Sequence, residues 1–486
     1  MASARATAAG VALAATSSTL LALLPLGACS DPCCTVDGFP IDLMTKEQRE
    51  AESPSLGGLV ARARDPKLGQ VTVSIDSSSP LTFYRAGADE RPQMTRRSFD
   101  LLGAIPRPDD GTLPRRAKFD NIPVLPVALD PAGAPIVVGG DLLRDFSIQI
   151  DFPLPAITFW AIPGGQDAFF GAGQCVGNSD NPLCYSVLHF NLLGGGELTA
   201  VSEPDFLGLT GPVEYAASRV LLRACAVPPA ADPVTDPQPL CCTRSDANRL
   251  AAGTNLALVV ATGVGPLVLS ESAWTRVAAA AVANGFAAPP SPAAAGPLFL
   301  PSLNAPFTAV TWSTVPRLAL VDLEADTTTN PGACVELAQA RRLEWVERHR
   351  LDPSPACVQP CDTDVREPSK AKNAAAYVEL GGEITVAIVP DGATFLQTLR
   401  AELRQQGPQV DGLLGTDVLA QTSLELDYTA SPSRAVFSCA PGTPRASCWS
   451  SPRCVRQAAP GDIHSCFGLP PQSLPEPKTC LPSGCS

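Results

Sequence analysis

The feature that most constrains the fold of this chain is a short internal duplication. The segment VGGDLLRDFSIQIDF, residues 138–152, aligns without gaps with LGTDVLAQTSLELDY, residues 414–428. The identical pairs are Gly139 with Gly415, Asp141 with Asp417, Leu143 with Leu419, Ser147 with Ser423 and Asp151 with Asp427. Each copy predicts a glycine turn, one short helical turn and an alternating strand. The repeat of these events in one order predicts two homologous lobes.

A strand followed by a tight turn of small residues precedes each copy. In the first block the stretch is VTVSIDSSSPLTFY, with the turn Asp76-Ser77-Ser78. In the second block it is LALVVATGVGPLVLSESAW, with the turn Ala261-Thr262-Gly263. The two lobes are therefore expected to present equivalent turns with different side chains.

Composition favours a mainly β protein. The chain has 50 prolines, 38 glycines and only 6% aromatic residues, which is typical of short strands and many turns. Its formal net charge of −13 argues against nucleic acid as a partner and against electrostatic binding to an anionic membrane. Residues 335–350 predict a charged helix, and Leu396, Leu399 and Leu403, spaced by three and four, mark an amphipathic helix that Gly407 would terminate.

Cysteine usage indicates an oxidising compartment. The chain has 17 cysteines, and setting Cys29 aside for lipidation leaves 16, enough for eight disulfides of open connectivity. A metal site would need clustered ligands, but His189, His349 and His464 are scattered and no pair of CxxC motifs exists. We therefore expect structural disulfides, no metal and no cofactor.

The N-terminus resembles the signal peptide of a bacterial lipoprotein. An apolar run from about Val11 to Leu26 is broken by polar residues and proline, so it would make a poor permanent membrane span. It ends in Leu26-Gly27-Ala28-Cys29, which resembles a lipobox. The resemblance implies that Cys29 is lipidated and that the chain is cleaved just before it. The mature protein would then be extracytoplasmic and lipid-anchored, and by analogy we expect it in the outer membrane. The alternative is an ordinary signal peptide with a cysteine nearby by chance.

Taken together, the turns and the duplicated segments resemble the pepsin-like and retropepsin-like aspartic peptidases. Each lobe of that family has an apolar strand leading into Asp-Thr/Ser-Gly, then a flap, then an Ile/Leu-Leu-Gly segment behind the turn. Val410 to Gly415 matches the second-lobe segment, Val138-Gly139 is a weaker first-lobe version, and 377–382 with 385–389 resembles strands returning from the flap. The resemblance implies a bilobal double β-barrel with a few short helices and, here, a disulfide-rich C-terminal tail.

The resemblance also implies roles for the turn residues, and here the chain departs from the family. Two adjacent carboxylates share one proton in such enzymes, and one of them activates water. Asp76 matches one carboxylate, but Ala261 stands where the second belongs. The supporting turn residues are Ser77, Ser78, Thr262 and Gly263. Ser77 and Thr262 keep both crosslinking hydroxyls and Gly263 keeps one glycine, whereas Ser78 replaces the other.

Other acids and nucleophiles fit the site less well. Asp391 lies only 24 residues before Gly415, whereas Asp76 precedes Gly139 by 63, so we interpret Asp391 as a turn residue. Asp352 has a suitable distance but no apolar strand leading into it. Ser270 lacks a Gly-x-Ser-x-Gly elbow, and we expect it to cap a helix instead.

These observations predict a five-part chain. The parts are a lipoprotein signal peptide (1–28), an N-terminal tether (29–55), an aspartic-peptidase-like lobe 1 (56–195), lobe 2 (196–440) with an insertion at about 280–370, and a Cys-rich tail (441–486).

The resemblance and the missing carboxylate favour a catalytically inactive protein that binds an extended peptide or protein segment in the interlobe cleft. Such binding needs backbone hydrogen bonds and side-chain pockets rather than acids. One alternative is an active acid endopeptidase that uses Asp76 and an unidentified second carboxylate. Another is a structural surface lipoprotein.

Overall fold

The computed structural model describes part of the chain. The described residues are 39–52, 57–87, 90, 93–102, 117–129, 131–160, 186–198, 213–226, 253–283, 287–294, 296–301, 306–322, 332–338, 340, 376–403, 409–428, 433–439, 447–450, 480–481 and 484–485. The predicted signal peptide, Cys29 and Asp352 lie outside these residues, as does most of the tail.

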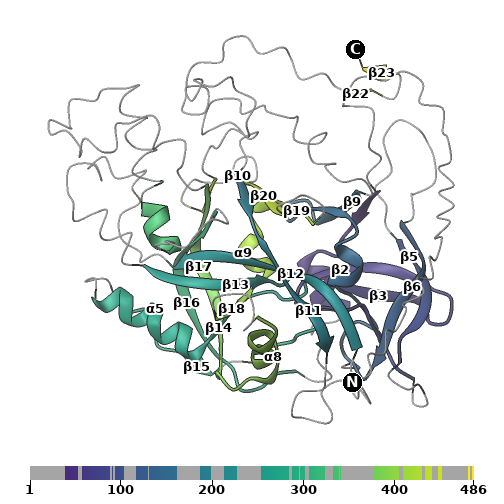
Figure 1. Ribbon diagram of the computed structural model, residues 1–486, viewed down its shortest axis with the longest axis horizontal. Coiled ribbons are helices and arrows are strands. Elements are labelled where there is room, and N and C mark those ends of the chain that lie inside the picture. Colours follow the sequence, from purple (N-terminus) through teal and green to yellow (C-terminus); the bar gives the residue numbers. More distant parts are fainter. Residues whose placement is uncertain are drawn as a thin grey trace, which may run out of the picture.

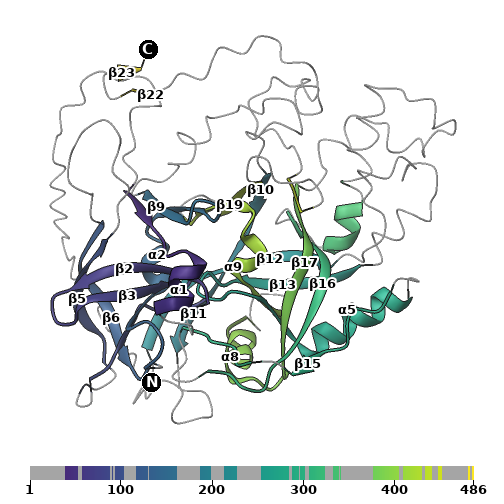
Figure 2. The same ribbon diagram turned by 180° about the vertical axis from the view of Figure 1, so that it is seen from behind.

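Two closed six-stranded β-barrels form the body of the molecule (Figures 1 and 2). The first consists of β2 (Leu59–Asp65), β3 (Gly69–Ile75), β4 (Phe83–Arg85), β5 (Thr95–Leu102), β6 (Ala117–Val127) and β7 (Ile136–Val138). The second consists of β12 (Val213–Ala226), β13 (Thr254–Val260), β14 (Leu267–Ser270), β16 (Thr311–Val321), β17 (Tyr377–Val389) and β18 (Gly412–Leu414).

The two barrels have the same topology. Around the first, the order is β2-β3-β7-β4-β6-β5, with parallel pairing only between β3 and β7 and between β4 and β6. Around the second, the order is β12-β13-β18-β14-β17-β16, closed by the β12–β16 pairing and parallel only at β13–β18 and β14–β17. This correspondence confirms the predicted mainly β, bilobal double barrel and extends the short sequence repeat to whole lobes.

A third sheet joins the lobes. Its order is β1 (Phe39–Asp42), β9 (Ala156–Trp160), β8 (Ser147–Asp151), β19 (Thr422–Asp427), β20 (Arg434–Cys439) and β10 (Ser186–His189). The strands of the two repeat copies, β8 and β19, pair antiparallel, with Ser147 opposite Asp427 and Asp151 opposite Ser423. Since these residues are also equivalent in the repeat, the pairing has a local two-fold axis at Gln149 and Glu425.

Short elements complete the described structure. The further strands are β11 (Asn191–Leu198), β15 (Ala293–Ala294), β21 (Cys448–Ser450), β22 (Cys480–Leu481) and β23 (Gly484–Cys485). The helices are α1 (Lys46–Glu52), α2 (Gly140–Leu143), α5 (Glu271–Ala283), α8 (Thr394–Leu403) and α9 (Thr416–Leu419). α8 confirms the helix predicted from Leu396, Leu399 and Leu403. No helix among the described residues is long and apolar enough to cross a membrane.

Two findings refine the sequence analysis of the second lobe. β16 lies inside the segment of about 280–370 that we predict as an insertion, so this part of the segment is a strand of the barrel. The two strand segments expected at 377–382 and 385–389 form one strand, β17, which bends where Gly382 and Glu383 have positive φ values of 92° and 47°. Pro316 of β16 lies opposite this bend, at a register shift in the β16–β17 pairing.

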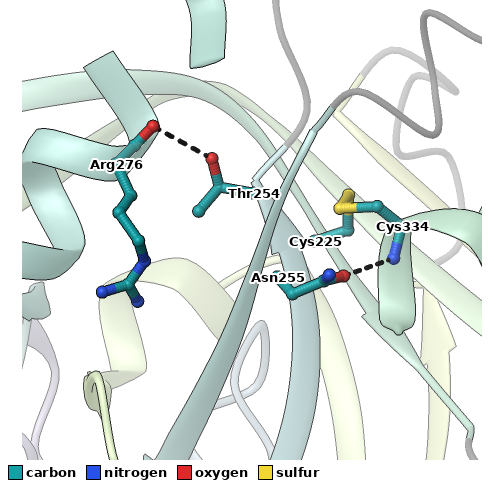
Figure 3. Close-up of a disulfide and its surroundings, with 5 residues drawn as sticks. All are labelled: Cys225, Thr254, Asn255, Arg276 and Cys334. Carbon is teal, nitrogen blue, oxygen red and sulfur yellow. Dashed lines mark hydrogen bonds between the residues drawn. A yellow bond between two sulfur atoms is a disulfide. The ribbon is translucent and has the colours of Figure 1, made fainter. Parts of the chain in front are cut away.

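The described residues contain two disulfides, which agree with the prediction of structural bridges. Cys225 of β12 pairs with Cys334, and Cys439 at the end of β20 pairs with Cys448 of β21. Beside the first bridge, the Cys334 backbone N–H donates to Asn255 Oδ1 at 2.8 Å (Figure 3). The bridge thereby fixes the segment after β16 to the strands β12 and β13.

Candidate functional site

Two equivalent turns, one from each barrel, meet between the lobes. Asp76-Ser77-Ser78 follows β3, and Ala261-Thr262-Gly263 follows β13. The last three residues of each strand before its turn are buried, which places the turn deep in the molecule. The Asp76 side chain is 1% exposed and Ala261 is fully buried.

The segment behind each turn explains the duplicated glycines. The backbone N–H of Asp76 donates to Val138 O, and that of Ala261 donates to Leu414 O, both at 2.9 Å. A Cβ at Gly139 would lie 2.1 Å from Leu81 O, and one at Gly415 would lie 2.1 Å from Pro266 O. Only glycine permits this close crossing, so both copies keep it.

The hydroxyls of Ser77 and Thr262 crosslink the two turns. Ser77 N–H donates to Thr262 Oγ1 at 3.0 Å, and Thr262 N–H donates to Ser77 Oγ at 3.3 Å. In turn, Ser77 Oγ–H donates to Val260 O and Thr262 Oγ1–H donates to Ile75 O, at 2.7 and 2.8 Å. The pattern is reciprocal, so the turns are related by a local two-fold axis like that of the sheet.

The symmetry fails at the acidic position. Asp76 Oδ1 accepts hydrogen bonds from the N–H and Oγ–H of Ser78, at 2.9 and 2.7 Å, and from Gly263 N–H at 3.4 Å. Ala261, which is equivalent to Asp76, brings no polar side-chain atom. The structure therefore brings together the six turn residues singled out in the sequence, with one carboxylate among them.

A buried cation that the sequence analysis did not identify lies next to this carboxylate. Arg219 of β12 is 4% exposed, and its Nε–H donates to Ser78 O at 2.7 Å. Because β12 and β13 pair with Leu221 opposite Val259, continuing the register places Arg219 beside Ala261. The same counting along β2 and β3 places Gly58 beside Asp76, so the equivalent position in the first lobe has no side chain. The position of Arg219 beside the turn follows from strand register alone, and no sequence motif indicates it.

Opposing influences act on the pKa of Asp76. Burial raises it above the ordinary value of 3.8, whereas the hydrogen bonds from Ser78 and Gly263 and the positive charge of Arg219 lower it. Burial in turn lowers the pKa of Arg219 to about 10. Tyr428, whose buried hydroxyl has no hydrogen-bond partner in the described part of the chain, has its pKa raised by burial and by the charge of Asp76.

A segment of the second lobe packs beside the turns. Leu298 and Phe307 exchange two backbone hydrogen bonds, and Leu298 and Leu300 belong to the apolar cluster that contains Ala261. Pro301 Cγ lies 2.8 Å from the position that a Cβ on Gly263 would take. The insertion predicted at about 280–370 thus includes residues packed near the site.

The other candidate residues have structural roles. Asp391 accepts hydrogen bonds from Ser272 N–H and Oγ–H, at 3.1 and 2.7 Å, and pairs with Arg400 at 3.0 Å. Ser270 Oγ accepts from Ala273 N–H at 3.2 Å, which is the expected N-cap of α5. No group of three metal-ligating side chains occurs among the residues that the structure describes.

The topology and the crosslinked turns define the architecture. The chain has an aspartic-peptidase-like fold.

No family model and no curated protein matches the sequence. Solved structures similar to the chain include an aspartic proteinase from Irpex lacteus, at 11% identity and a TM-score of 0.32, covering 85% of this chain and 100% of that one. Basic 7S globulin from soybean is similar at 11% identity and a TM-score of 0.36, covering 83% of this chain and 95% of that one. A protein described as edgp has 11% identity and a TM-score of 0.37, with the same coverage. The strand topology and the crosslinked turns establish the fold.

Proposed function

We propose that this protein is a catalytically inactive member of the aspartic-peptidase-like fold that binds an extended peptide or protein segment between its lobes. The proposed inactivity rests on Ala261, which occupies the position equivalent to Asp76. An alanine cannot share a proton with Asp76, activate water or polarise a scissile carbonyl.

The surroundings of Asp76 support this reading. A general acid–base pair in this fold needs a second carboxylate near the first, but the charged group that affects Asp76 among the described residues is the guanidinium of Arg219. Asp391, the other described candidate, is held by Ser272 and Arg400. The 1% exposure of Asp76 also leaves little access for a nucleophilic water.

Peptide binding is proposed because the double barrel is retained without its chemistry. The lobes stay crosslinked through Ser77 and Thr262, although no catalytic pair remains to be aligned. Recognition of an extended peptide uses main-chain hydrogen bonds, and these do not require a carboxylate in either turn. The expected ligand is thus a strand-like segment and not a small molecule.

A binding experiment tests the proposal. The purified protein, with its disulfides intact, would be screened against fluorescent peptides derived from unfolded proteins, and binding would be followed by anisotropy. Matched peptides with alternate backbone nitrogens methylated should lose binding, because methylation removes main-chain donors without changing side chains. Absence of binding to all peptides, or equal binding of methylated ones, would contradict the proposed mode.

We further propose that Cys29 carries a lipid that anchors the protein on the outside of a membrane. The support is the apolar run ending in Leu26-Gly27-Ala28-Cys29, together with disulfides of a kind that persist in oxidising compartments. Metabolic labelling with a radioactive fatty acid should mark the wild type and not a Cys29→Ser variant. Equal labelling of both would exclude this attachment site.

A further inference from the structure

A short segment of the second lobe, residues 298–301, lies against the junction of the two turns. The point that a Cβ on Gly263 would occupy is 2.7 Å from Cγ of Asp76 and 2.8 Å from Cγ of Pro301. Because both distances start from one point, the ring of Pro301 also lies next to the carboxyl group of Asp76. Pro301 therefore takes up space between the lobes that a bound chain would enter to approach this carboxyl group.

Two leucines hold the segment on the second lobe. Leu298 and Leu300 are 2% and 7% exposed, and both belong to the apolar cluster that contains Ala261. Phe299 between them is only half-buried, so alternate side chains are buried, as they are along a strand. Leu298 and Phe307 also exchange backbone hydrogen bonds of 2.9 and 2.8 Å. The segment thus packs through alternate apolar side chains and pairs through its main chain, as an extended peptide does when it binds.

We propose that residues 298–301 occupy the peptide site of this protein, and that the ligand displaces them. The ligand is then an uncharged, apolar segment of the same kind, with large apolar side chains two residues apart and a proline next to them. This inference rests on the proposed function, to which it adds the chemical class of the ligand and a competitor within the chain. Residues 296–301 carry no charged side chain, and the cluster that receives them is apolar.

A competitor within the chain lowers the measured affinity for peptide. A tethered segment competes at an effective concentration on the order of millimolar when its connection is short and flexible. The apparent Kd of a ligand rises in proportion as the fraction of protein with an open site falls. A variant that loosens residues 298–301 should therefore bind peptide more tightly than the wild type, even though it loses buried contacts.

A binding experiment with the intact protein tests the inference. The probe is a fluorescein-labelled peptide with the sequence of residues 296–301, GPLFLP, and its anisotropy is followed. Leu298→Ala should lower the Kd of this peptide by about tenfold or more, because the segment loses most of one buried anchor. Leu399→Ala is the matched control, since Leu399 of α8 is a 4% exposed leucine of the same cluster, and it should leave the Kd at the wild-type value.

A peptide with serine in place of both leucines should bind to none of these proteins. Equal Kd values for the wild type and Leu298→Ala would overturn the inference. Absence of GPLFLP binding would overturn the inference alone if peptides of the screen above still bind, and the proposed function as well if they do not.

A milder variant covers the case in which Leu298→Ala does not fold. Pro301→Gly changes a half-buried position and removes the ring beside Asp76, so it should lower the Kd by a smaller factor. An unchanged Kd for a folded Pro301→Gly protein would again overturn the inference.

Hydrogen exchange gives a second readout on the wild type. The N–H groups of Leu298 and Phe307 each donate to the other residue's carbonyl oxygen, so both should exchange slowly while the segment is in place. Such a short pairing is not stable without packing against the lobe. Saturation with GPLFLP should therefore speed up exchange at both amides. Unchanged protection with the peptide bound would show that the peptide does not displace the segment, and would overturn the inference.

Discussion

At the residue scale, the site is a scaffold of two crosslinked turns around one carboxylate. Ser77 and Thr262 each donate and accept across the lobes, and both are almost completely buried. Each of these two residues therefore helps to hold one barrel against the other.

The crosslink predicts a stability effect. Thr262→Val keeps the shape of the side chain but leaves Ser77 N–H and Ile75 O without their partner, so the free energy of unfolding should fall by about 1–3 kcal/mol for each buried group left unpaired. Thr72, half-buried on β3, is the matched control, and its change to valine should stay within about 0.5 kcal/mol. Urea unfolding measures both, and equal losses would contradict the assigned role of the crosslink.

The pKa of Asp76 gives a second residue-scale prediction. Because burial raises the pKa in the folded state, the contribution of Asp76 to stability is greatest below its ordinary value of 3.8 and is lost as pH rises through the folded-state pKa. The stability of the wild type relative to Asp76→Asn should therefore decrease as pH rises over this window. A relative stability that increases with pH would show that the folded-state pKa is lowered instead.

Arg219 should limit this shift. Arg219→Met should raise the pKa of Asp76 further, whereas Arg223→Met, on the same strand but without influence on Asp76, should leave it unchanged. Carbon-13 NMR titration would distinguish the two variants.

The turn residues are predictable from the sequence because strand, turn and glycine follow one another along the chain. Arg219 is not, because its position depends on the register between β12 and β13, which is set by pairing between distant segments. The same is true of Pro301, which approaches Gly263 through packing of Leu298 and Leu300.

At the element scale, α5 is fixed at its N-terminus by two side chains. Ser270 Oγ accepts from Ala273 N–H, and Asp391, on the turn after β17, accepts from Ser272. The first contact was predictable from local sequence because capping acts within one turn. The second was not, because it depends on the parallel pairing of β14 with β17.

This arrangement predicts that Asp391 supports stability. Asp391→Ala should lower the free energy of unfolding by about 0.5–2 kcal/mol, as expected for loss of a helix cap. Asp391→Asn keeps one acceptor oxygen and should lose less, and thermal unfolding by circular dichroism measures both. If Asp391→Ala were as stable as the wild type, the contacts with Ser272 and Arg400 would have no energetic role.

At the scale of the whole molecule, the duplicated segments predicted two lobes, and the identical strand orders of the barrels bear this out. What the sequence could not supply is how the lobes join. The pairing of β8 with β19, centred on Gln149 and Glu425, forms only when the two copies meet in space. The disulfide partners were open for the same reason.

The disulfides predict unequal contributions to stability. Cys225 and Cys334 are separated by 109 residues, whereas Cys439 and Cys448 are separated by 9. On the chain-entropy model, replacing the first pair by alanine should destabilise the protein by about 2 kcal/mol more than replacing the second. Denaturant unfolding of the two double variants tests this, and a larger loss for the short loop would contradict it.

The central claim is that the two equivalent turns carry a single carboxylate, Asp76, and that the protein is therefore inactive, and cleavage is its most direct test. The purified protein and its Asp76→Ala variant would be incubated with a denatured protein mixture from pH 3 to 7, and the products analysed by mass spectrometry. We predict no cleavage by either protein at any pH. Cleavage by the wild type that disappears in Asp76→Ala would contradict it and would require a second carboxylate beside Asp76.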